Sequence, residues 1–123
     1  MFTHVMVGAD DIAASKAFYD AIFGAMDIPA GKTDATGRVF YRVPAGAFGI
    51  TRPIDGQPAS VANGGTIGFA AASPEQVRAW HDAGLAAGGS TCEDPPGARK
   101  GFGAYAAYLR DPVGNKLCIS CPV

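Results

Sequence analysis

The sequence has little charge and no long apolar stretch. Only 17% of its 123 residues are charged, the formal net charge is −1, and no run of like charge exceeds two residues, as at Asp10-Asp11 and Arg99-Lys100. The chain therefore lacks the basic surface that binds nucleic acid or an anionic membrane. It also lacks the roughly eighteen consecutive apolar residues of a membrane span and the features of a secretory leader. We expect a cytoplasmic protein that binds a small molecule or a second copy of itself.

Cysteine is also scarce, and its number is odd. The three residues are Cys92, Cys118 and Cys121, so a disulfide framework is not expected and the thiols should be reduced. Cys118 and Cys121 have the spacing of a CxxC motif, but they fall in a strand-like segment, where residues three apart point to opposite faces. This pair is therefore weak evidence for a redox or zinc site.

Hydrophobic residues are plentiful, at 48% of the chain. A chain of this size and apolar content is expected to form one globular domain with its own core, covering residues 1–123. Within that domain we predict two modules, because the second half of the sequence resembles the first.

The two halves align in their helical segments and again in their last strands. At a shift of 62 positions, KAFYDA at 16–21 lies over RAWHDA at 78–83. At a shift of 68, FYRVPAG at 40–46 lies over YLRDPVG at 108–114, so the second copy holds six extra residues, which we place in the Gly/Pro-rich segment 94–101. These matches predict one module at about 1–56 and another at about 57–123.

Each copy reads as a strand, a helix and further strands. Asp10 or Asp11 can cap a helix that stops near Gly24, and Ser73-Pro74-Glu75-Gln76 is typical of the start of a helix that stops at Gly88-Gly89. Alternating or β-rich runs predict strands at 2–8, 39–43, 48–51, 104–109 and 116–120, with weaker ones near 27–33 and 90–93.

A start of the form HVxV, the helix segment FYDAIFG and the ending YLRDPVGNKLCI together resemble the glyoxalase/bleomycin-resistance/dioxygenase family, also known as the vicinal oxygen chelate superfamily. The resemblance covers nearly the whole chain. It implies an α+β fold of two tandem βαβββ modules, whose strands curve into a cup with the helices outside. Ligand and metal in this family are bound inside the cup.

The resemblance also identifies the positions at which family members hold their metal. His4 stands where the first module supplies a histidine, but the matching position of the second module is Thr66. The carboxylate positions fall on Cys118 and on Gly49 or Ile50, depending on one gap. A complete ligand set is therefore missing, and we expect no cofactor. Zinc, nickel or iron at His4 would need donors that these positions do not supply.

Several candidate site residues have both a structural and a functional interpretation. His4 is either a hydrogen-bonded histidine with no catalytic role, or a general base or a donor that orients the ligand. Thr66 either packs in a strand or binds ligand, and Cys118 is either a small buried hydrophobic side chain or a reactive thiol. Tyr105 is a candidate for the cup wall, as are Tyr41 and Tyr108.

Five cations could meet an anionic ligand: Arg38, Arg42, Arg52, Arg99 and Lys100. Arg52, at the end of the first module, is the better ligand candidate. Arg42 and Arg110 recur beside matching turns, which fits a structural role such as bonding loop carbonyls. Arg99 and Lys100 lie in the segment that only the second copy carries, and its Gly and Pro content suits a mobile lid.

Three functions are compatible with these features. The first is a lactoylglutathione-lyase-like lyase or isomerase, with His4 as acid or base. The second is a non-catalytic protein of the antibiotic-resistance type that sequesters a small molecule. The third is a dimeric scaffold with a vestigial cup. We expect a homodimer in each case, because pairing would cover sheet edges that otherwise invite aggregation.

Overall fold

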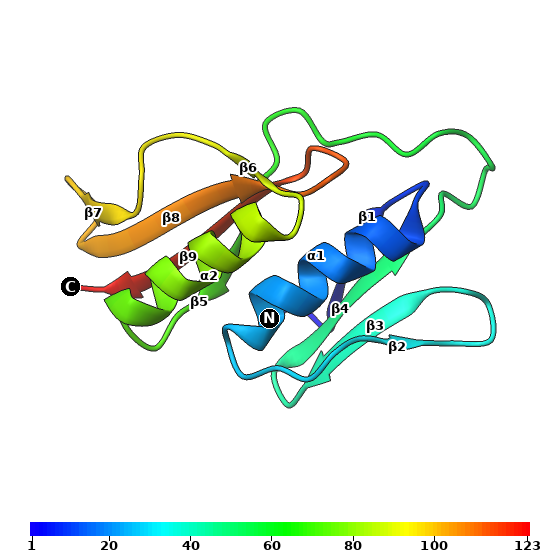
Figure 1. The fold of residues 1–123 in the computed structure, drawn as a ribbon, viewed down its shortest axis with the longest axis horizontal. Helices are drawn as coiled ribbons and strands as arrows, with labels where there is room; N and C mark the ends of the chain where they lie inside the picture. Colours follow the sequence, from blue (N-terminus) through cyan, green and yellow to red (C-terminus); the bar gives the residue numbers. More distant parts are fainter.

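The computed structural model describes residues 1–123 and contains two β-sheets, each with a helix on one face (Figure 1). The first half comprises β1 (His4–Gly8), α1 (Ile12–Gly24), β2 (Lys32–Thr33), β3 (Val39–Val43) and β4 (Gly46–Thr51). The second half comprises β5 (Ile67–Ala70), α2 (Pro74–Ala86), β6 (Ser90–Thr91), β7 (Gly97–Arg99), β8 (Ala104–Arg110) and β9 (Lys116–Pro122).

The two sheets have the same topology. Their strand orders are β1-β4-β3-β2 and β5-β9-β8-β6, and in each sheet the first strand runs parallel to the last while the other pairs are antiparallel. The α+β fold with two βαβββ units is therefore confirmed. Strand β7 pairs with β8 outside this order and lies within residues 94–101. That segment, expected as a loop and a lid, is thus partly held in the sheet.

Both helices begin at the predicted caps. Asp11 Oδ1 accepts from the backbone N–H of Ala14 at 3.0 Å, and Ser73 Oγ accepts from that of Gln76 at 3.2 Å. Pro74 occupies the first position of α2, where its missing N–H costs no hydrogen bond. Helix α1 ends at Gly24 as predicted, whereas α2 ends at Ala86, two residues before the predicted stop at Gly88-Gly89.

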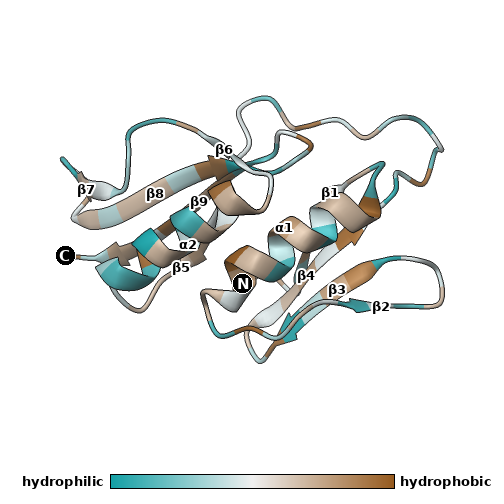
Figure 2. Ribbon diagram, viewed as in Figure 1, coloured by the Kyte–Doolittle hydropathy of each residue, from teal (hydrophilic) through white to brown (hydrophobic).

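One hydrophobic core joins the two halves. Helices α1 and α2 pack on each other, and the inner faces of both sheets pack beneath them. Phe69 of β5 links the modules, because its ring centroid lies 5.3 Å from that of Phe23 and 5.9 Å from that of Phe48. Figure 2 shows hydrophobic residues concentrated in the helices and strands, while the long connection between β4 and β5 is largely hydrophilic.

Two residues of α2 lie in environments that are unusual for their side chains. Apolar Leu85 is 38% exposed, whereas polar His81 is buried. The reason is the position of Gly84, which α2 turns toward Ile22 and Leu109. Leu85 is rotated by about 100° from Gly84 and so leaves the packed face.

A buried polar contact ties α1 to the second module. The Tyr19 hydroxyl donates to Asp111 Oδ2 at 2.6 Å, and Asp111 Oδ1 accepts from three backbone N–H groups of the β8–β9 turn. Burial and the neighbouring Asp111 raise the pKa of Tyr19 far above its ordinary value. In the same turn, Arg110 donates to the Gly114 carbonyl at 2.8 Å, as expected from the sequence. Arg42 makes no such bond and lies over the Phe40 ring.

Candidate functional site

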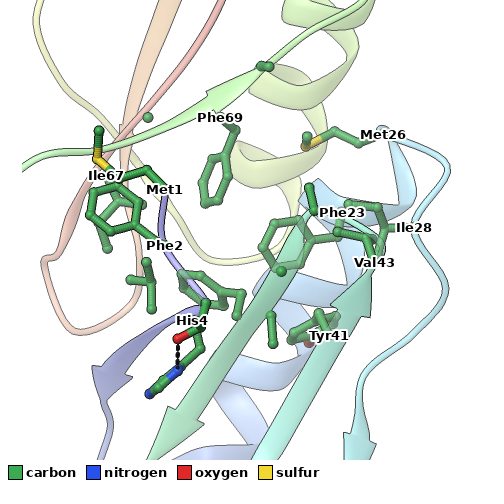
Figure 3. Close-up of a pocket in the computed structure, with 18 of the residues that line it drawn as sticks. Met1, Phe2, His4, Phe23, Met26, Ile28, Tyr41, Val43, Ile67 and Phe69 are labelled. Atoms are coloured by element: carbon green, nitrogen blue, oxygen red, sulfur yellow. Dashed lines mark hydrogen bonds between the residues drawn. The ribbon is translucent and has the colours of Figure 1, made fainter.

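An apolar groove of about 570 Å³ lies between the two modules. One wall is formed by the start of β1 and by the β3–β4 hairpin, and the other by β5 (Figure 3). Fourteen of its 19 lining residues are hydrophobic, and the remaining five are Thr3, His4, Gly46, Thr66 and Gly68. Side chains that could bind a ligand by polar contacts are thus few and lie at the rim.

Aromatic side chains form the base of the groove. Phe23 is central, because its ring centroid lies 4.7 Å from that of Tyr41 and 5.3 Å from those of Phe48 and Phe69. Figure 3 shows Phe23 and Phe69 facing the space that Met26, Ile28 and the N-terminal residues also border. The groove therefore lies directly over the core. Phe23, Tyr41 and Phe48 are almost completely buried, and Phe69, which is only partly buried, is the ring most open to a ligand.

His4 and Thr66 are brought together in this groove, one from each module. His4 is exposed, and its Nδ1 lies 2.8 Å from Thr3 Oγ1 (Figure 3). Its Nε2 has no hydrogen-bond partner within the chain. His4 also lines a second hollow, on the face of the first sheet that the helices leave open. It therefore stands at the boundary between the two spaces.

The other candidates from the sequence lie elsewhere. Cys118 pairs with Gly68 and Tyr108 on the open face of the second sheet. Arg52 follows β4 and borders a small hollow beside the β2–β3 turn. The Tyr105 hydroxyl accepts from Arg78 of α2 at 2.9 Å, on the helix side of its sheet. Of the five predicted site residues, His4 and Thr66 therefore line the groove, and the other three lie at separate positions outside it.

The sheet register decides the position that one sequence gap left open. Gly49 lies opposite Met6 and Phe40, and Ile50 lies opposite Val7 and Val39. Ile50 is fully buried, so Gly49 is the residue that shares a face with His4. A Cβ atom at Gly49 would overlap the Met6 thioether and approach the Phe40 ring, so these two side chains fill the space at this position.

The residues at these positions do not fit a resident metal ion. His4, Gly49, Thr66 and Cys118 supply one imidazole and one thiol, on different sheets. No group of three or more His, Cys, Asp or Glu side chains gathers closely enough to hold an ion. We therefore assign no step of any reaction to a metal.

The surroundings of Cys118 keep its thiol protonated. It is half-buried, and burial raises its pKa despite the nearby Arg99 and Tyr108. Arg99 and Lys116 both lie over the Tyr108 ring, at 5.6 and 5.2 Å from its centroid, and Lys116 is paired with Glu93. A thiol with a raised pKa is a poor nucleophile at neutral pH. This environment argues against a nucleophilic role for Cys118.

The protein contains two βαβββ units, each with its helix on one face of the sheet and the other face open. It therefore belongs to the class of paired βαβββ folds. A sequence profile of the Glyoxalase/Bleomycin resistance protein/Dioxygenase superfamily matches residues 1–119. The chain belongs to this superfamily. None of its helices has the length and apolarity needed to cross a membrane.

Solved structures agree with this assignment. A glyoxalase/bleomycin resistance protein from Albidiferax ferrireducens is 58% identical, with a TM-score of 0.93 over 98% of both chains. Lactoylglutathione lyase from Agrobacterium tumefaciens is 25% identical, with a TM-score of 0.66 over 98% of this chain and 92% of that one. A glyoxalase-related enzyme from Fulvimarina pelagi, 20% identical, shares the fold with a TM-score of 0.76 over 98% and 86%. A search of curated proteins found no match.

The sequence did not reveal the aromatic base of the groove. Phe23, Phe48 and Phe69 read as ordinary core positions, and only the packing of the two modules makes them border an open space. Phe2, which lies two residues before β1 and is exposed in the structure, is the one aromatic lining residue outside the core whose place in the sequence could have pointed here.

Proposed function

We propose that the protein binds an apolar small molecule in the groove between its modules and does so without a metal ion. The observation that carries this proposal is the groove itself, whose volume of about 570 Å³ and hydrophobic lining are typical of small-molecule sites. Burial of the ligand against Phe2, Ile67 and Phe69, the lining side chains that keep exposed surface, supplies the affinity. His4 and Thr66 at the rim orient its polar end.

A resistance-type role, in which the molecule is sequestered unchanged, agrees with this chemistry. The groove offers aromatic walls and few polar side chains, and no Asp or Glu lines it. Proton shuttling of the kind that glyoxalases perform requires a carboxylate or an equivalent base near the ligand. Binding is therefore favoured over turnover.

A lyase or isomerase that uses His4 alone is the second candidate. It is supported by the likeness to lactoylglutathione lyase from Agrobacterium tumefaciens and by the free Nε2 of His4, which can accept or donate a proton at the rim of the groove. In this reading the Thr3 hydroxyl fixes the orientation of the ring through Nδ1. Consumption of a bound ligand that stops in a His4→Ala variant would favour this candidate over simple binding.

Fluorescence titration with N-phenyl-1-naphthylamine, an uncharged aromatic probe, tests the groove. Saturable binding is expected, and Ile67→Ser should weaken it by at least about fivefold because Ile67 lines the wall of β5. Leu85→Ser is the matched control, since Leu85 is an exposed apolar residue outside the groove. Absence of saturable binding, or equal binding by the Ile67 variant, would contradict the proposal.

Elemental analysis tests the metal-free reading. Because no cluster of metal-binding side chains is present, protein purified without chelators should contain well under one divalent ion per chain by inductively coupled plasma spectrometry. Stoichiometric zinc, nickel or iron would show that donors other than His4 and Cys118 complete a site.

A further inference from the structure

The open face of the first sheet is strongly cationic. Strand register places His4, Phe40 and Arg42 on this face, away from the helices. A hollow of about 520 Å³ on it is lined by His4, Arg38 and Arg42 over a floor that includes Met6 and Phe40. A smaller hollow of about 170 Å³ adjoins it through Arg38 and Thr51 and is bordered by Arg52. Neither lining contains Asp or Glu.

These arginines are not neutralised by ion pairs. The three salt bridges of the chain join Lys16 to Asp20, Arg78 to Glu75 and Lys116 to Glu93, and none lies on this face. Asp34 is a nearby carboxylate, but its Oδ1 accepts from the backbone N–H groups of Thr36 and Arg38 and from the Thr36 hydroxyl. One Asp34 charge beside three guanidinium groups leaves an excess of positive charge.

Arg42 is held in a way that suits recognition of a planar anion. Its guanidinium carbon lies 4.6 Å from the centroid of the Phe40 ring, so the ring supports one face of the group. The N–H groups at the guanidinium edge make no hydrogen bond within the chain and can meet a carboxylate, sulfonate or phosphate in pairs.

We propose that this hollow binds the anionic group of the ligand, so that the protein selects organic anions with an aromatic or other apolar body. The inference rests on the proposed function, because the apolar body occupies the groove between the modules. Thr3, His4 and Ala47 line both spaces, so the hollow adjoins the groove at the start of β1. A cationic ligand would meet repulsion from Arg38 and Arg42, which argues against sequestration of a cationic antibiotic.

Paired probes test the inference. The anionic 8-anilinonaphthalene-1-sulfonate carries the same ring system as the uncharged N-phenyl-1-naphthylamine and adds one sulfonate. Arg38→Gln and Arg42→Gln should each weaken binding of the sulfonate about tenfold while changing binding of the neutral probe less than twofold. Arg42→Lys should give an intermediate loss of affinity for the sulfonate, because lysine keeps the positive charge but lacks the paired N–H groups of the guanidinium. Arg78→Gln on α2 is the matched control.

The outcomes separate the two proposals. Arginine-independent binding of the sulfonate, with saturable binding of the neutral probe, overturns the anion site and leaves the groove intact. Arginine-dependent binding of the sulfonate without binding of the neutral probe supports the anion site and overturns the groove. If the arginine variants lose affinity equally for both probes, the substitutions disturb the fold in general, and the inference is overturned. Thermal unfolding of each variant is compared with the parent protein to detect such a disturbance.

Discussion

The hydroxyl of Tyr19 makes a buried hydrogen bond between the two modules, in addition to the partly buried bond that Gln76 Nε2 donates to the Ala25 carbonyl at 3.2 Å. Tyr19→Phe keeps the ring and removes the hydrogen bond to Asp111, which retains a bond from the Asn115 side chain at 2.8 Å. We expect a loss of about 1–2 kcal/mol in the free energy of unfolding, measured by urea denaturation. Tyr105→Phe, whose hydroxyl lies at the surface, should change it by less than about 0.5 kcal/mol. Equal effects would contradict a special role for the Tyr19 contact.

Asp20 gives the stability a dependence on acid pH. Burial alone would raise its pKa, but hydrogen bonds from Lys16, Gly31 N–H and Tyr41 outweigh burial and lower the pKa below the ordinary 3.8. A lowered pKa in the folded state contributes stability above the unfolded-state pKa, and this contribution is lost as the pH falls through the folded value. Asp20→Asn should therefore cost about 1 kcal/mol at pH 7 and clearly less at pH 3. Urea denaturation of the parent protein and the variant at both pH values measures this cost. A larger difference in the free energy of unfolding at pH 3 than at pH 7 would contradict the prediction.

Helix α2 approaches the rest of the core through a glycine. A Cβ atom at Gly84 would lie 3.0 Å from Ile22 Cγ2 and closer still to Leu109. Gly84→Ala should therefore lower the melting temperature, although alanine is the better helix former by roughly 1 kcal/mol. Gly24→Ala at the end of α1 meets no atom within 4 Å and should leave stability unchanged or slightly higher. A stabilising Gly84→Ala would contradict the close approach.

The elements of the fold are predictable from the sequence to different degrees. The starts of both helices were predicted, with Asp10 as an alternative to Asp11 at the first, because Asp11 and Ser73 act locally, through hydrogen bonds within three residues. Strand β7 was missed, since its Gly and Pro neighbours indicate a loop and only pairing with β8 makes it a strand.

The candidate site is less predictable than its elements. His4 and Thr66 were found through the family positions, but the groove depends on how β5 packs against the first module. The orientation of Gly49 depends on strand register, which one gap in the alignment of the two copies left undetermined. Long-range packing and register are the quantities that a local pattern cannot supply.

The accessible surface of the whole chain is larger than that expected for a monomer of its mass. Its accessible area is 6989 Å², whereas a monomer of 12.5 kDa is expected to expose about 6,200 Å². Strands β1 and β5 each have one unpaired edge, and Phe2 beside β1 is 71% exposed. We predict a homodimer that covers part of this surface. Sedimentation equilibrium at micromolar concentrations should give twice the mass of the chain, and a single-chain mass would contradict the prediction.

Trp80 gives the molecule an internal optical donor. It is the only tryptophan of the chain, it is fully buried on α2, and its ring centroid lies 6.4 Å from that of Phe69, which borders the groove. Emission from Trp80 overlaps the absorption of naphthylamine probes, so a probe seated against Phe69 should quench it by resonance energy transfer. The core residue that holds α2 in place therefore also reports, without any label, whether a bound molecule occupies the space between the modules.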